Sequence, residues 1–385
     1  MLAVTAGAHL GGTERVLLDL ATHAREHGVE LRVLTPIDGP LLPELAARGI
    51  PADIVPAPDA LLRATQRAGG VTTWPRAAGG LAAWAKRLAG HAWMAEADVL
   101  YTVGFKAHLA GTAAAGLPRV WHLHEFPPRR TGWVWRTLMA SLPDRLVAVS
   151  GAVAKAWQLP ERTGVVPNGV DLTRFRPNAP TGWIHDRLHL PRTARLLGMP
   201  AVLARWKGHL DVIDAFAAVA ERIPDVHLVL IGSAIYDTAA EEAYTGVLEE
   251  RARAASRVHR LEFQSAVERV YPECVVTVHY STRAEPFGRV VVESMACGVP
   301  VVAAAEGGPL EILGADGPGP GTGGWLVAPR MPDALAATLA ELLALDAATL
   351  GRVGAAGRRR VEDHFGAEAH AARLCGVLRG GVGRE

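Results

Sequence analysis

The sequence predicts an α/β protein of two domains, and three observations support this prediction. Short apolar strands alternate with helical segments in the first half of the chain and again in the second half. Between them, residues 171–195 lack this alternation and carry Pro177, Pro180 and Pro191, which is typical of an interdomain hinge. A chain of 385 residues with 49% apolar content is long enough to form two hydrophobic cores.

Composition and charge narrow the possible functions. Lys and Arg total 40 and Asp and Glu total 39, so no overall field attracts nucleic acid, and no nucleic-acid partner is expected. The three cysteines, Cys274, Cys297 and Cys375, lie far apart in apolar runs, which indicates buried thiols in a reducing compartment. No apolar run reaches the ~20 residues that span a bilayer, and no basic leader precedes the first strand. We therefore expect a cytoplasmic enzyme.

The N-terminal segment predicts a βαβ unit. A strand at 2–5, a glycine loop at 7–12 and a helix at 13–21 precede a second strand at 31–35. A loop of this kind can approach a phosphate closely because glycine lacks a Cβ atom. A glycine pair alone more often makes a simple turn, so the loop is only supporting evidence for a phosphate site.

The next part of the first domain has a weaker pattern. Its predicted elements are a helix at 41–47, a strand at 52–56, a helical region at 59–95 broken at Gly69-Gly70 and Gly79-Gly80, a strand at 98–103, a helix at 106–115 and strands at 120–124, 146–150 and 164–166. Residues 59–95 in particular carry the least specific pattern of the first domain.

Two histidines end the strand at 120–124. The alternation of side chains along a strand places His122 and His124 on the same face. Ligands of open α/β sheets bind outside the carboxyl ends of the strands, which is where His124 and Glu125 lie. A single histidine is more often structural, and a zinc site would need a third ligand at suitable spacing. Two histidines at a strand end favour a role in function.

The segment 129–139 combines arginines with Trp133 and Trp135. This composition could support weak peripheral contact with a membrane surface or with an acceptor lipid. The alternative is an ordinary helix whose tryptophans pack on the sheet and whose arginines face solvent. Both interpretations stay open at this point.

A second α/β pattern starts at residue 196. The segment Arg205-Trp206-Lys207 lies between a strand and a helix at 208–222, and the strand at 226–231 ends before Gly232. Only four of the 40 basic residues are lysines, so Lys207 stands out as a compact charge suited to phosphate, although a surface lysine is the alternative. The remaining predicted elements are a helix at 239–255, a strand at 258–263, a short helix at 266–271, a strand at 274–279, a helix start at 307–313 and a helical tail at 332–380.

The stretch that begins at Glu285 carries the clearest chemical signal. Glu285 opens a Pro/Phe/Gly turn, a helix follows, and Glu293 lies eight residues further on. Because Glu285 precedes the helix, the two carboxylates can converge at the N-terminal end of the helix. The N–H groups of Phe287, Gly288 and Arg289 would face the same pocket and form an anion site. Carboxylates beside an anion site suggest a ligand with both hydroxyls and phosphate, such as a nucleotide sugar.

With these motifs the chain resembles the retaining glycosyltransferases of family 4, which have the GT-B fold. The resemblance covers nearly the whole chain and rests mainly on Glu285-Pro-Phe-Gly…Glu293-Ser-Met-Ala-Cys-Gly-Val-Pro, Trp206-Lys207-Gly-His and Val166-Pro-Asn-Gly-Val-Asp171. It implies two Rossmann-like doubly wound domains that face a central cleft. The implied parts are an acceptor domain at 1–175, a donor domain at 176–364, and a last helix within 365–385 that crosses back to the first domain.

The resemblance also assigns roles in donor binding. It implies that Glu293 binds the ribose hydroxyls, that Glu285 and the backbone at Phe287 and Gly288 contact the donor sugar, and that Lys207 holds the diphosphate. Further donor contacts are implied for Gly12, Gly232, Leu261 and Phe263, the last three beside the nucleobase. The family usually has an arginine five or six residues before the lysine, where this chain has Ala201 and Val202, so Arg205 is a candidate replacement.

On the acceptor side, the resemblance places His124 beside the donor sugar and the acceptor, with Glu14 and Glu125 as candidate acceptor contacts. Glu285, Lys207 and His124 are the candidate catalytic residues. The implied reaction moves a sugar from a nucleotide diphosphate, UDP in preference to GDP, to an acceptor hydroxyl with retained configuration and without a metal or other cofactor. The expected acceptor is a small molecule, a secondary metabolite, or a glycan or lipid precursor. Because no carboxylate pair is placed as nucleophile and acid, same-face substitution is the expected mechanism.

Three alternatives remain. Another GT-B enzyme, such as a phosphorylase or a nucleotide-sugar epimerase, would use the same donor site. A non-catalytic nucleotide-sugar-binding subunit is suggested by the missing arginine at Val202. A dinucleotide-dependent oxidoreductase is disfavoured, because the loop at 7–12 lacks the required glycine spacing.

Overall fold

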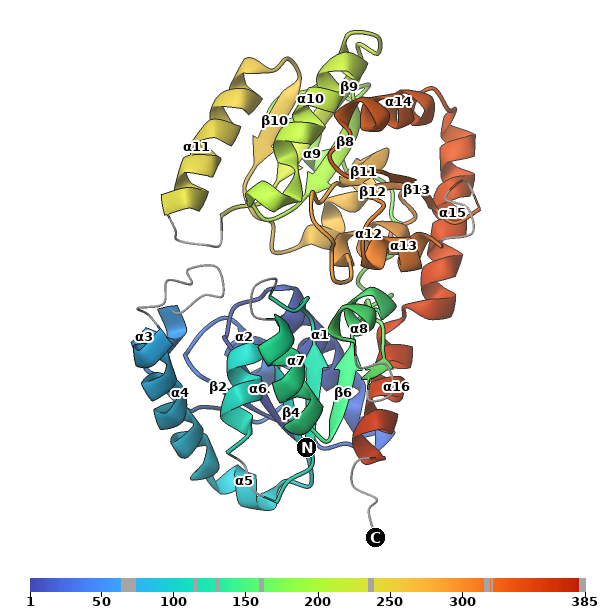
Figure 1. Cartoon of the computed structure of the whole chain (residues 1–385). Coiled ribbons are helices and arrows are strands. Elements are labelled where there is room, and N and C mark those ends of the chain that lie inside the picture. The colour runs from blue at the N-terminus through green and yellow to red at the C-terminus, as the bar shows by residue number, and fades with distance from the viewer. Residues whose placement is uncertain are drawn as a thin grey trace. The chain divides into compact units, whose positions relative to one another are not determined.

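The computed structural model describes residues 1–63, 74–113, 116–128, 132–158, 163–234, 239–314, 319 and 321–380. The chain forms two compact units, each built on its own sheet (Figure 1). The first unit contains Met1–Gly169 together with the C-terminal segment from Ala367, and the second contains Val170–Gly366. The units therefore divide at 169/170 and at 366/367, a few residues from the boundaries expected from the sequence.

The first unit contains a seven-stranded parallel sheet in the order β3-β2-β1-β4-β5-β6-β7. The strands are β1 (Leu2–Thr5), β2 (Arg32–Thr35), β3 (Ala52–Ile54), β4 (Leu100–Val103), β5 (Arg119–Leu123), β6 (Arg145–Ala148) and β7 (Thr163–Val165). The strand order reverses between β1 and β4, which makes this the switch point of a doubly wound sheet. Ligands of such sheets bind outside the carboxyl ends of the strands at that point.

Helices cover both faces of this sheet. They are α1 (Gly12–His23), α2 (Leu41–Ala46), α3 (Asp59–Arg63), α4 (Trp74–Ala89), α5 (Ala92–Glu96), α6 (Phe105–Gly111), α7 (Gly132–Ser141), α8 (Gly151–Trp157) and α16 (Ala367–Arg379), with a 3-10 turn η1 (Ala24–His27) after α1. Successive residues of β1 enter different cores: Ala3 packs with residues of α1, α2 and α16, whereas Leu2 and Val4 pack with residues of α3, α4 and α6. This alternation is what a strand buried on both faces requires.

Two observations concern the helices that the sequence predicted. The predicted break at Gly79-Gly80 is wrong, because α4 continues through both residues. Neither glycine needs a positive φ, and Gly80 packs closely against α3, where an added Cβ would lie 3.3 Å from the side chain of Leu61. Gly80 thus allows close helix packing, whereas a Cβ on Gly79 would meet no atom within 4 Å. The predicted break at Gly69-Gly70 lies outside the described residues.

The second unit contains a six-stranded parallel sheet in the order β10-β9-β8-β11-β12-β13. The strands are β8 (Arg195–Pro200), β9 (Val226–Ile231), β10 (Val258–Leu261), β11 (Val276–His279), β12 (Val301–Ala304) and β13 (Gly324–Val327). Here the strand order reverses between β8 and β11. The carboxyl ends of these two strands are therefore the expected ligand position in the second unit.

The helices of the second unit are α9 (Trp183–Leu188), α10 (His209–Ala220), α11 (Ala239–Ala254), α12 (Arg289–Ala296), α13 (Gly308–Leu313), α14 (Pro332–Leu343) and α15 (Ala347–His364), with 3-10 turns η3 (Arg205–Lys207), η4 (Val267–Arg269) and η5 (Tyr271–Glu273). The main core lies between the sheet and α10, α11 and α14, and Phe216 and Leu228 are fully buried in it. In the part of the chain that the structure describes, no single helix is long and apolar enough to cross a membrane, and only the pair α14 and α15, bent by 112°, passes by length and composition together.

The segment that begins at Val170 is held to the rest of the second unit by side-chain contacts. Arg174 forms an ion pair with Glu268, with Nη2 of the arginine 2.7 Å from Oε2 of the glutamate. Nη1 of Arg358 donates a hydrogen bond of 2.7 Å to the carbonyl oxygen of Phe175. The predicted hinge at 171–195 therefore lies inside the second compact unit.

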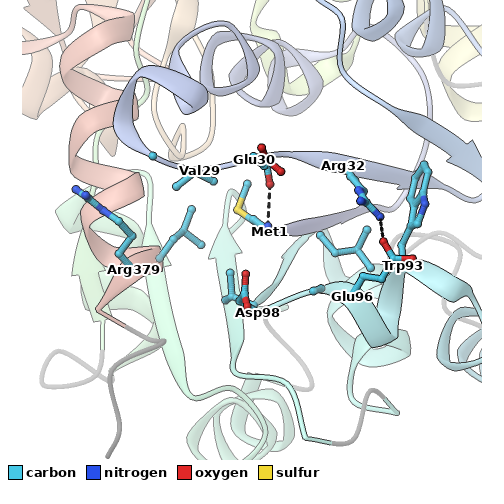
Figure 2. Close-up of a pocket in the computed structure, with 13 residues that line it drawn as sticks. Met1, Val29, Glu30, Arg32, Trp93, Glu96, Asp98 and Arg379 are labelled. Carbon is cyan, nitrogen blue, oxygen red and sulfur yellow. Dashed lines mark hydrogen bonds and ion pairs between the residues drawn. The ribbon is translucent and has the colours of Figure 1, made fainter.

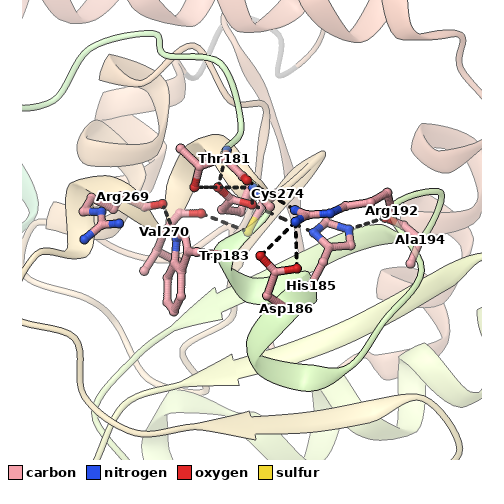
Figure 3. A network of polar contacts seen from close by, with 11 residues as sticks. Thr181, Trp183, His185, Asp186, Arg192, Ala194, Arg269, Val270 and Cys274 are labelled. Atoms are coloured by element: carbon pink, nitrogen blue, oxygen red, sulfur yellow. Dashed lines mark hydrogen bonds and ion pairs between the residues drawn. The ribbon is translucent and has the colours of Figure 1, made fainter.

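The buried carboxylate of Glu273 holds the same segment further along the chain. Figure 3 shows its partner Thr181 within this polar network. Oε1 of Glu273 accepts hydrogen bonds from the backbone N–H of Thr181 at 2.7 Å and from its hydroxyl at 2.9 Å, and Oε2 accepts from the N–H of Gly182 at 2.9 Å. The Glu273 side chain is only 1% exposed. α9 begins directly after Gly182, so this carboxylate fixes the two residues that immediately precede the helix.

Candidate functional site

The switch point of the second sheet brings Lys207 and Glu285 together. Lys207 lies in η3 after β8, and Glu285 lies in the loop after β11. Nζ of Lys207 is 2.7 Å from Oε2 of Glu285, and the two side chains are 12% and 13% exposed. Two residues that the sequence predicted from separate motifs thus form one nearly buried ion pair.

Two further groups hold the same carboxylate. The hydroxyl of Ser281 donates a hydrogen bond of 2.8 Å to Oε2 of Glu285, and Nε2 of His279 lies 3.5 Å from that oxygen. Burial alone would raise the pKa of Glu285, but the Lys207 ammonium and the His279 hydrogen bond outweigh burial and hold this pKa well below its ordinary range. Glu285 therefore stays ionised at neutral pH. His279 was missed by the sequence reasoning, although its place at the end of β11 was a usable signal.

The loop from Glu285 to Gly288 is fixed by its backbone. The N–H of Gly308 donates a hydrogen bond of 2.8 Å to the carbonyl oxygen of Glu285. A Cβ atom on Gly308 would lie 2.2 Å from the carbonyl oxygen of Phe287, so the loop and the start of α13 touch through their main chains. Gly288 has φ +104 and precedes α12, which confirms the predicted change from loop to helix.

Glu293 occupies a separate network on α12. The hydroxyl of Tyr271 donates a hydrogen bond of 2.7 Å to Oε2 of Glu293, and Nε of Arg289 donates one of 3.1 Å to Oε1. Burial and the Glu293 carboxylate raise the pKa of Tyr271 well above its ordinary value, so the phenol keeps its proton. The contacts of Glu293 thus differ from those of Glu285. The i,i+4 spacing of Arg289 and Glu293 could have predicted their ion pair, but Tyr271 carries no local signal.

The residues predicted beside the nucleobase lie at the neighbouring strand ends. Gly232 follows β9, and its N–H donates a hydrogen bond of 3.0 Å to the carbonyl oxygen of Leu261 on β10. A Cβ atom on Gly232 would lie 1.9 Å from the carbonyl oxygen of Ala201, which explains the glycine there. The N–H of Phe263 donates to the hydroxyl of Ser233 at 3.0 Å, and the Phe263 side chain is 56% exposed. The structure therefore brings Gly232, Leu261 and Phe263 together.

Arg205 does not join the ion pair of Lys207. Its guanidinium carbon lies 5.8 Å from the ring centroid of Tyr244 on α11, and the residue is exposed. Arg260 on β10 is a cation that the sequence reasoning missed, and its Nη2 donates a hydrogen bond of 3.1 Å to the carbonyl oxygen of Gly232. Both arginines are thus engaged away from Glu285, which gives Arg205 no direct support as the replacement for the arginine absent at Val202.

In the first unit, His124 follows β5 at the carboxyl edge of the sheet. Its ring centroid lies 4.1 Å from that of His122, which confirms that the two histidines share a face. His122 is fully buried, and its Nδ1 lies 2.5 Å from the hydroxyl oxygen of Tyr101. Burial lowers the pKa of His122 well below its ordinary value, so its ring is neutral and Tyr101 donates to Nδ1.

The other predicted residues of the first unit have different surroundings. Gly12 begins α1 and is exposed. Burial raises the pKa of Glu14, whose carboxylate folds back to within 2.8 Å of the position that a Cβ on Gly11 would take. Glu125 is exposed, and its carbonyl oxygen accepts a hydrogen bond of 3.0 Å from the indole of Trp157.

The predicted membrane contact at 129–139 lies partly outside the described residues. Within α7, Trp135 is 7% exposed, and its ring centroid lies 5.0 Å from that of Phe105. This burial agrees with the alternative of a helix that packs on the domain through its tryptophan. Peripheral membrane contact stays a prediction.

The first unit also contains a cavity away from these residues. A cavity of about 320 Å³ lies at the amino ends of β1 and β2, the edge of the sheet opposite to His124, with Glu30, Arg32 and Asp98 in its wall (Figure 2). Across the described residues, no group of three or more His, Cys, Asp or Glu side chains is arranged to hold a metal ion. All three cysteines are buried free thiols.

Two models of known protein families match this chain. Residues 10–174 match the family model described as Glycosyltransferase Family 4, and residues 184–360 match the model described as Glycosyl transferases group 1. The chain belongs to the family 4 glycosyltransferases. Together the two matches include every candidate site residue of this glycosyltransferase chain and every strand of the two sheets except β1.

Curated relatives share part of the chain. A GDP-mannose-dependent monoacylated α-(1-6)-phosphatidylinositol monomannoside mannosyltransferase of Corynebacterium glutamicum is 30% identical over 221 residues, which are 56% of this chain and 55% of that protein. A D-inositol 3-phosphate glycosyltransferase of Mycolicibacterium gilvum is 36% identical over 198 residues, which are 50% of this chain and 42% of that protein. The chain spans about half the length of the curated relatives it matches.

Solved structures share the whole fold. Anabaena HepE in complex with UDP is 25% identical with a TM-score of 0.80, and the match covers 98% of this chain and 99% of HepE. Sucrose-phosphate synthase of Thermosynechococcus elongatus is 21% identical with a TM-score of 0.76, and the match covers 98% of each chain. Two Rossmann-like parallel-sheet domains of the GT-B type are therefore the fold of this glycosyltransferase chain.

Proposed function

We propose that the chain is a retaining glycosyltransferase that moves a sugar from a UDP-sugar to an acceptor hydroxyl without a metal ion. The observation that carries this proposal is the Lys207–Glu285 ion pair at the switch point of the second sheet, directly before the start of α12. A lysine, a carboxylate and a helix start at one strand edge supply a cation for diphosphate and an acceptor for sugar hydroxyls. Family membership supports the same assignment.

The proposed reaction breaks the bond between the anomeric carbon and the diphosphate oxygen. The acceptor oxygen attacks from the same face, and its proton passes to the departing diphosphate. Lys207 and the N–H groups at the start of α12 would stabilise the negative charge that develops on the leaving group. Glu285, which is kept ionised by Lys207 and His279, would accept hydrogen bonds from the donor sugar and orient it.

Other residues complete the proposed binding site. We assign Glu293 to the ribose hydroxyls, and we assign Gly232, Leu261 and Phe263 to the nucleobase. In the first unit we assign Gly12 to donor phosphate, and His124 with Glu14 and Glu125 to the acceptor. These assignments rest on the family resemblance and on the strand edges at which the residues lie.

The identity of the nucleotide rests on two relatives. UDP is supported by the structure of Anabaena HepE in complex with UDP. The relative from Corynebacterium glutamicum is described as GDP-mannose-dependent, so GDP is the competing donor. Thermal unfolding with UDP, UDP-glucose, GDP and GDP-mannose separates them, because a ligand of the folded state raises the apparent stability according to its affinity. We expect larger shifts with the uridine ligands, and larger shifts with the guanosine ligands would reverse the assignment.

Transfer is then measured with the donor that binds. We expect a product whose anomeric configuration matches the donor by NMR, and a rate that is unchanged by EDTA. Inverted configuration or loss of activity with EDTA would overturn the mechanism. If the donor binds and is neither hydrolysed nor transferred, the alternative of a non-catalytic nucleotide-sugar-binding subunit is favoured. Conversion of the donor without an acceptor would favour an epimerase, and consumption of phosphate would favour a phosphorylase.

We also propose a reducing cytoplasmic location, on the basis of three buried free thiols. Fractionation of the native host checks this proposal, and recovery of the protein outside the cytoplasm contradicts it.

A further inference from the structure

Lys106 lies at the ligand edge of the first sheet. β4 ends at Val103, a turn through Gly104 with φ +88 follows, and α6 begins at Phe105. A Cβ atom on Gly104 would lie 2.8 Å from the side chain of Ala6, so this turn packs directly against the loop that follows β1. β1 and β4 flank the switch point of the sheet. Lys106 therefore occupies the position where an open α/β sheet binds its ligand.

The ammonium of Lys106 is half-buried and bonded to a neutral group. Its Nζ donates a hydrogen bond of 2.8 Å to the carbonyl oxygen of Leu62, at the end of α3. Within the described ranges, no carboxylate forms an ion pair with Lys106. Two other partly buried cations, Lys207 and Arg289, each face a glutamate, whereas Arg260 resembles Lys106 in donating to backbone carbonyl oxygens. Burial lowers the pKa of Lys106, as expected when water is removed from a charge without compensation.

The stretch of sequence that continues from α3 through α4 is basic in composition. From Ala60 to Ala95 the sequence has no Asp or Glu, whereas it contains four arginines and one lysine. α4, which belongs to this stretch, packs against α6, the helix that carries Lys106. The candidate acceptor contact Glu14 is folded back on its own loop at Gly11. Among the residues that the structure describes, the half-buried ammonium of Lys106 therefore has a carbonyl partner and no carboxylate partner.

We propose that Lys106 binds an anionic group of the acceptor, so that the acceptor substrate is a hydroxyl compound carrying a phosphate or a carboxylate. This inference rests on the proposed transferase function and specifies the substrate class of its acceptor site. A lysine ammonium is a compact charge with three donors, of which the Leu62 carbonyl takes one, so the others can reach anionic oxygens. Phosphate, with more charge and more acceptor oxygens than a carboxylate, should bind more tightly.

The scarcity of lysine gives a direct test on the unmodified protein. The chain has only Lys86, Lys106, Lys155 and Lys207, so the acylation rate of each amine can be followed by peptide mass spectrometry. The probes are inorganic phosphate, glycerol 3-phosphate, inositol phosphate, glucose 6-phosphate, glucuronate and glucose, at constant ionic strength. We expect phosphate compounds to slow labelling of Lys106, glucuronate to slow it less, and glucose to leave it unchanged, with Lys86 and Lys155 as internal controls. Unchanged labelling of Lys106 with every anion would overturn the proposal.

A transfer assay supplies the second test. Acceptors are compared as matched pairs with and without phosphate, using the full-length protein and its preferred nucleotide sugar. We expect the phosphorylated member to be preferred, and Lys106→Met to raise its KM by roughly tenfold or more. Lys155→Met, which changes an exposed lysine of α8, is the matched control and should match wild type. Preference for neutral acceptors, or an unchanged KM in Lys106→Met, would contradict the proposal.

Failure of this inference can be distinguished from failure of the proposed function. If uridine and guanosine nucleotides all fail to raise the thermal stability, the transferase assignment fails, and the labelling of Lys106 still reports whether an anion binds. If a nucleotide binds and sugar is transferred only to neutral acceptors, the transferase assignment stands and the anionic acceptor is rejected.

Discussion

Nζ of Lys207 lies 2.7 Å from Oε2 of Glu285, although the two residues come from different motifs and different strand ends. In this arrangement the cation proposed for the donor diphosphate is already compensated by the carboxylate proposed for the donor sugar. The hydroxyl of Ser281 supports the same oxygen at 2.8 Å. The donor diphosphate must therefore bind beside an ion pair that is already formed.

Lys207→Ala should lower turnover by roughly 10²–10³, because one preorganised charge on the leaving group is lost. Loss of the lysine also leaves Glu285 ionised and nearly buried, so the variant should be less stable. The pair of changes Lys207→Met and Glu285→Gln removes both charges and should recover stability without recovering turnover. Thermal unfolding and kcat with the preferred donor check both outcomes. Turnover close to wild type in Lys207→Ala would remove Lys207 from the mechanism.

Glu293→Gln should weaken donor affinity more than it lowers turnover at saturation, because the carboxylate is proposed to bind ribose and not to transfer protons. The amide keeps the side-chain shape but loses the charge that faces Arg289. KM for the donor and kcat separate the two effects. A normal KM with a strongly reduced kcat would instead indicate acid–base chemistry at Glu293.

Tyr271→Phe, which removes a buried donor to Glu293, should lower the free energy of unfolding by about 1–2 kcal/mol.

Gly308→Ala should weaken donor binding and lower stability, because the new Cβ would lie 2.2 Å from the carbonyl oxygen of Phe287. The backbone of the loop from Glu285 to Gly288 would have to move. Gly246→Ala is the matched control, because a Cβ there meets no atom within 4 Å and Gly246 lies inside α11. This control should be neutral or stabilising by up to about 1 kcal/mol. Equal donor affinity in the two variants would show that the loop tolerates the displacement.

The free energy of unfolding should fall as the pH drops below about 6.5. Burial, assisted by Arg260 and Lys207, lowers the pKa of His209 from 6.5 to about 3. Between these values the unfolded state takes up a proton that the folded state does not, so the stability gained from keeping His209 neutral is lost progressively toward pH 3. Urea unfolding at several pH values measures this slope. Buried His108 and His122, whose pKa values are lowered in the same direction, add to this slope, so His209→Asn should reduce it in part. The exposed control His189→Asn should leave the slope unchanged, and equal slopes in both variants would show that His209 does not contribute.

Glu273→Gln should lower the free energy of unfolding by about 1–3 kcal/mol, because an amide cannot reproduce the hydrogen bonds that both carboxylate oxygens accept from Thr181 and Gly182. Asp186→Asn is the control, since Asp186 forms an exposed ion pair with Arg192 and should contribute less than about 1 kcal/mol. Chemical denaturation of the two variants gives the comparison. Similar losses of unfolding free energy in both variants would mean that the buried Glu273 stabilises the fold no more than the exposed Asp186 does.

Local patterns were sufficient for most of the fold. Apolar strands that alternate with helices, and the loop before α12 with its glycine, depend on neighbouring residues in the sequence, so periodicity and turn chemistry predict them. The break predicted at Gly79-Gly80 was wrong for a tertiary reason: the lack of a side chain at Gly80 lets α4 pack closely on Leu61, and the helix continues. A glycine pair gives the same local signal whether a helix ends there or continues through it.

By itself, the sequence predicted Lys207, Glu285 and Glu293 as the chemical groups of a donor site, because a scarce lysine and carboxylates beside strand and helix ends are visible without coordinates. Only the tertiary structure decided their partners. In it Lys207 forms an ion pair with Glu285, and Tyr271 and Arg289 donate hydrogen bonds to Glu293. The physical reason is that hydrogen bonds and ion pairs depend on distances of about 3 Å between side chains, which the parallel sheet sets and the spacing along the chain does not.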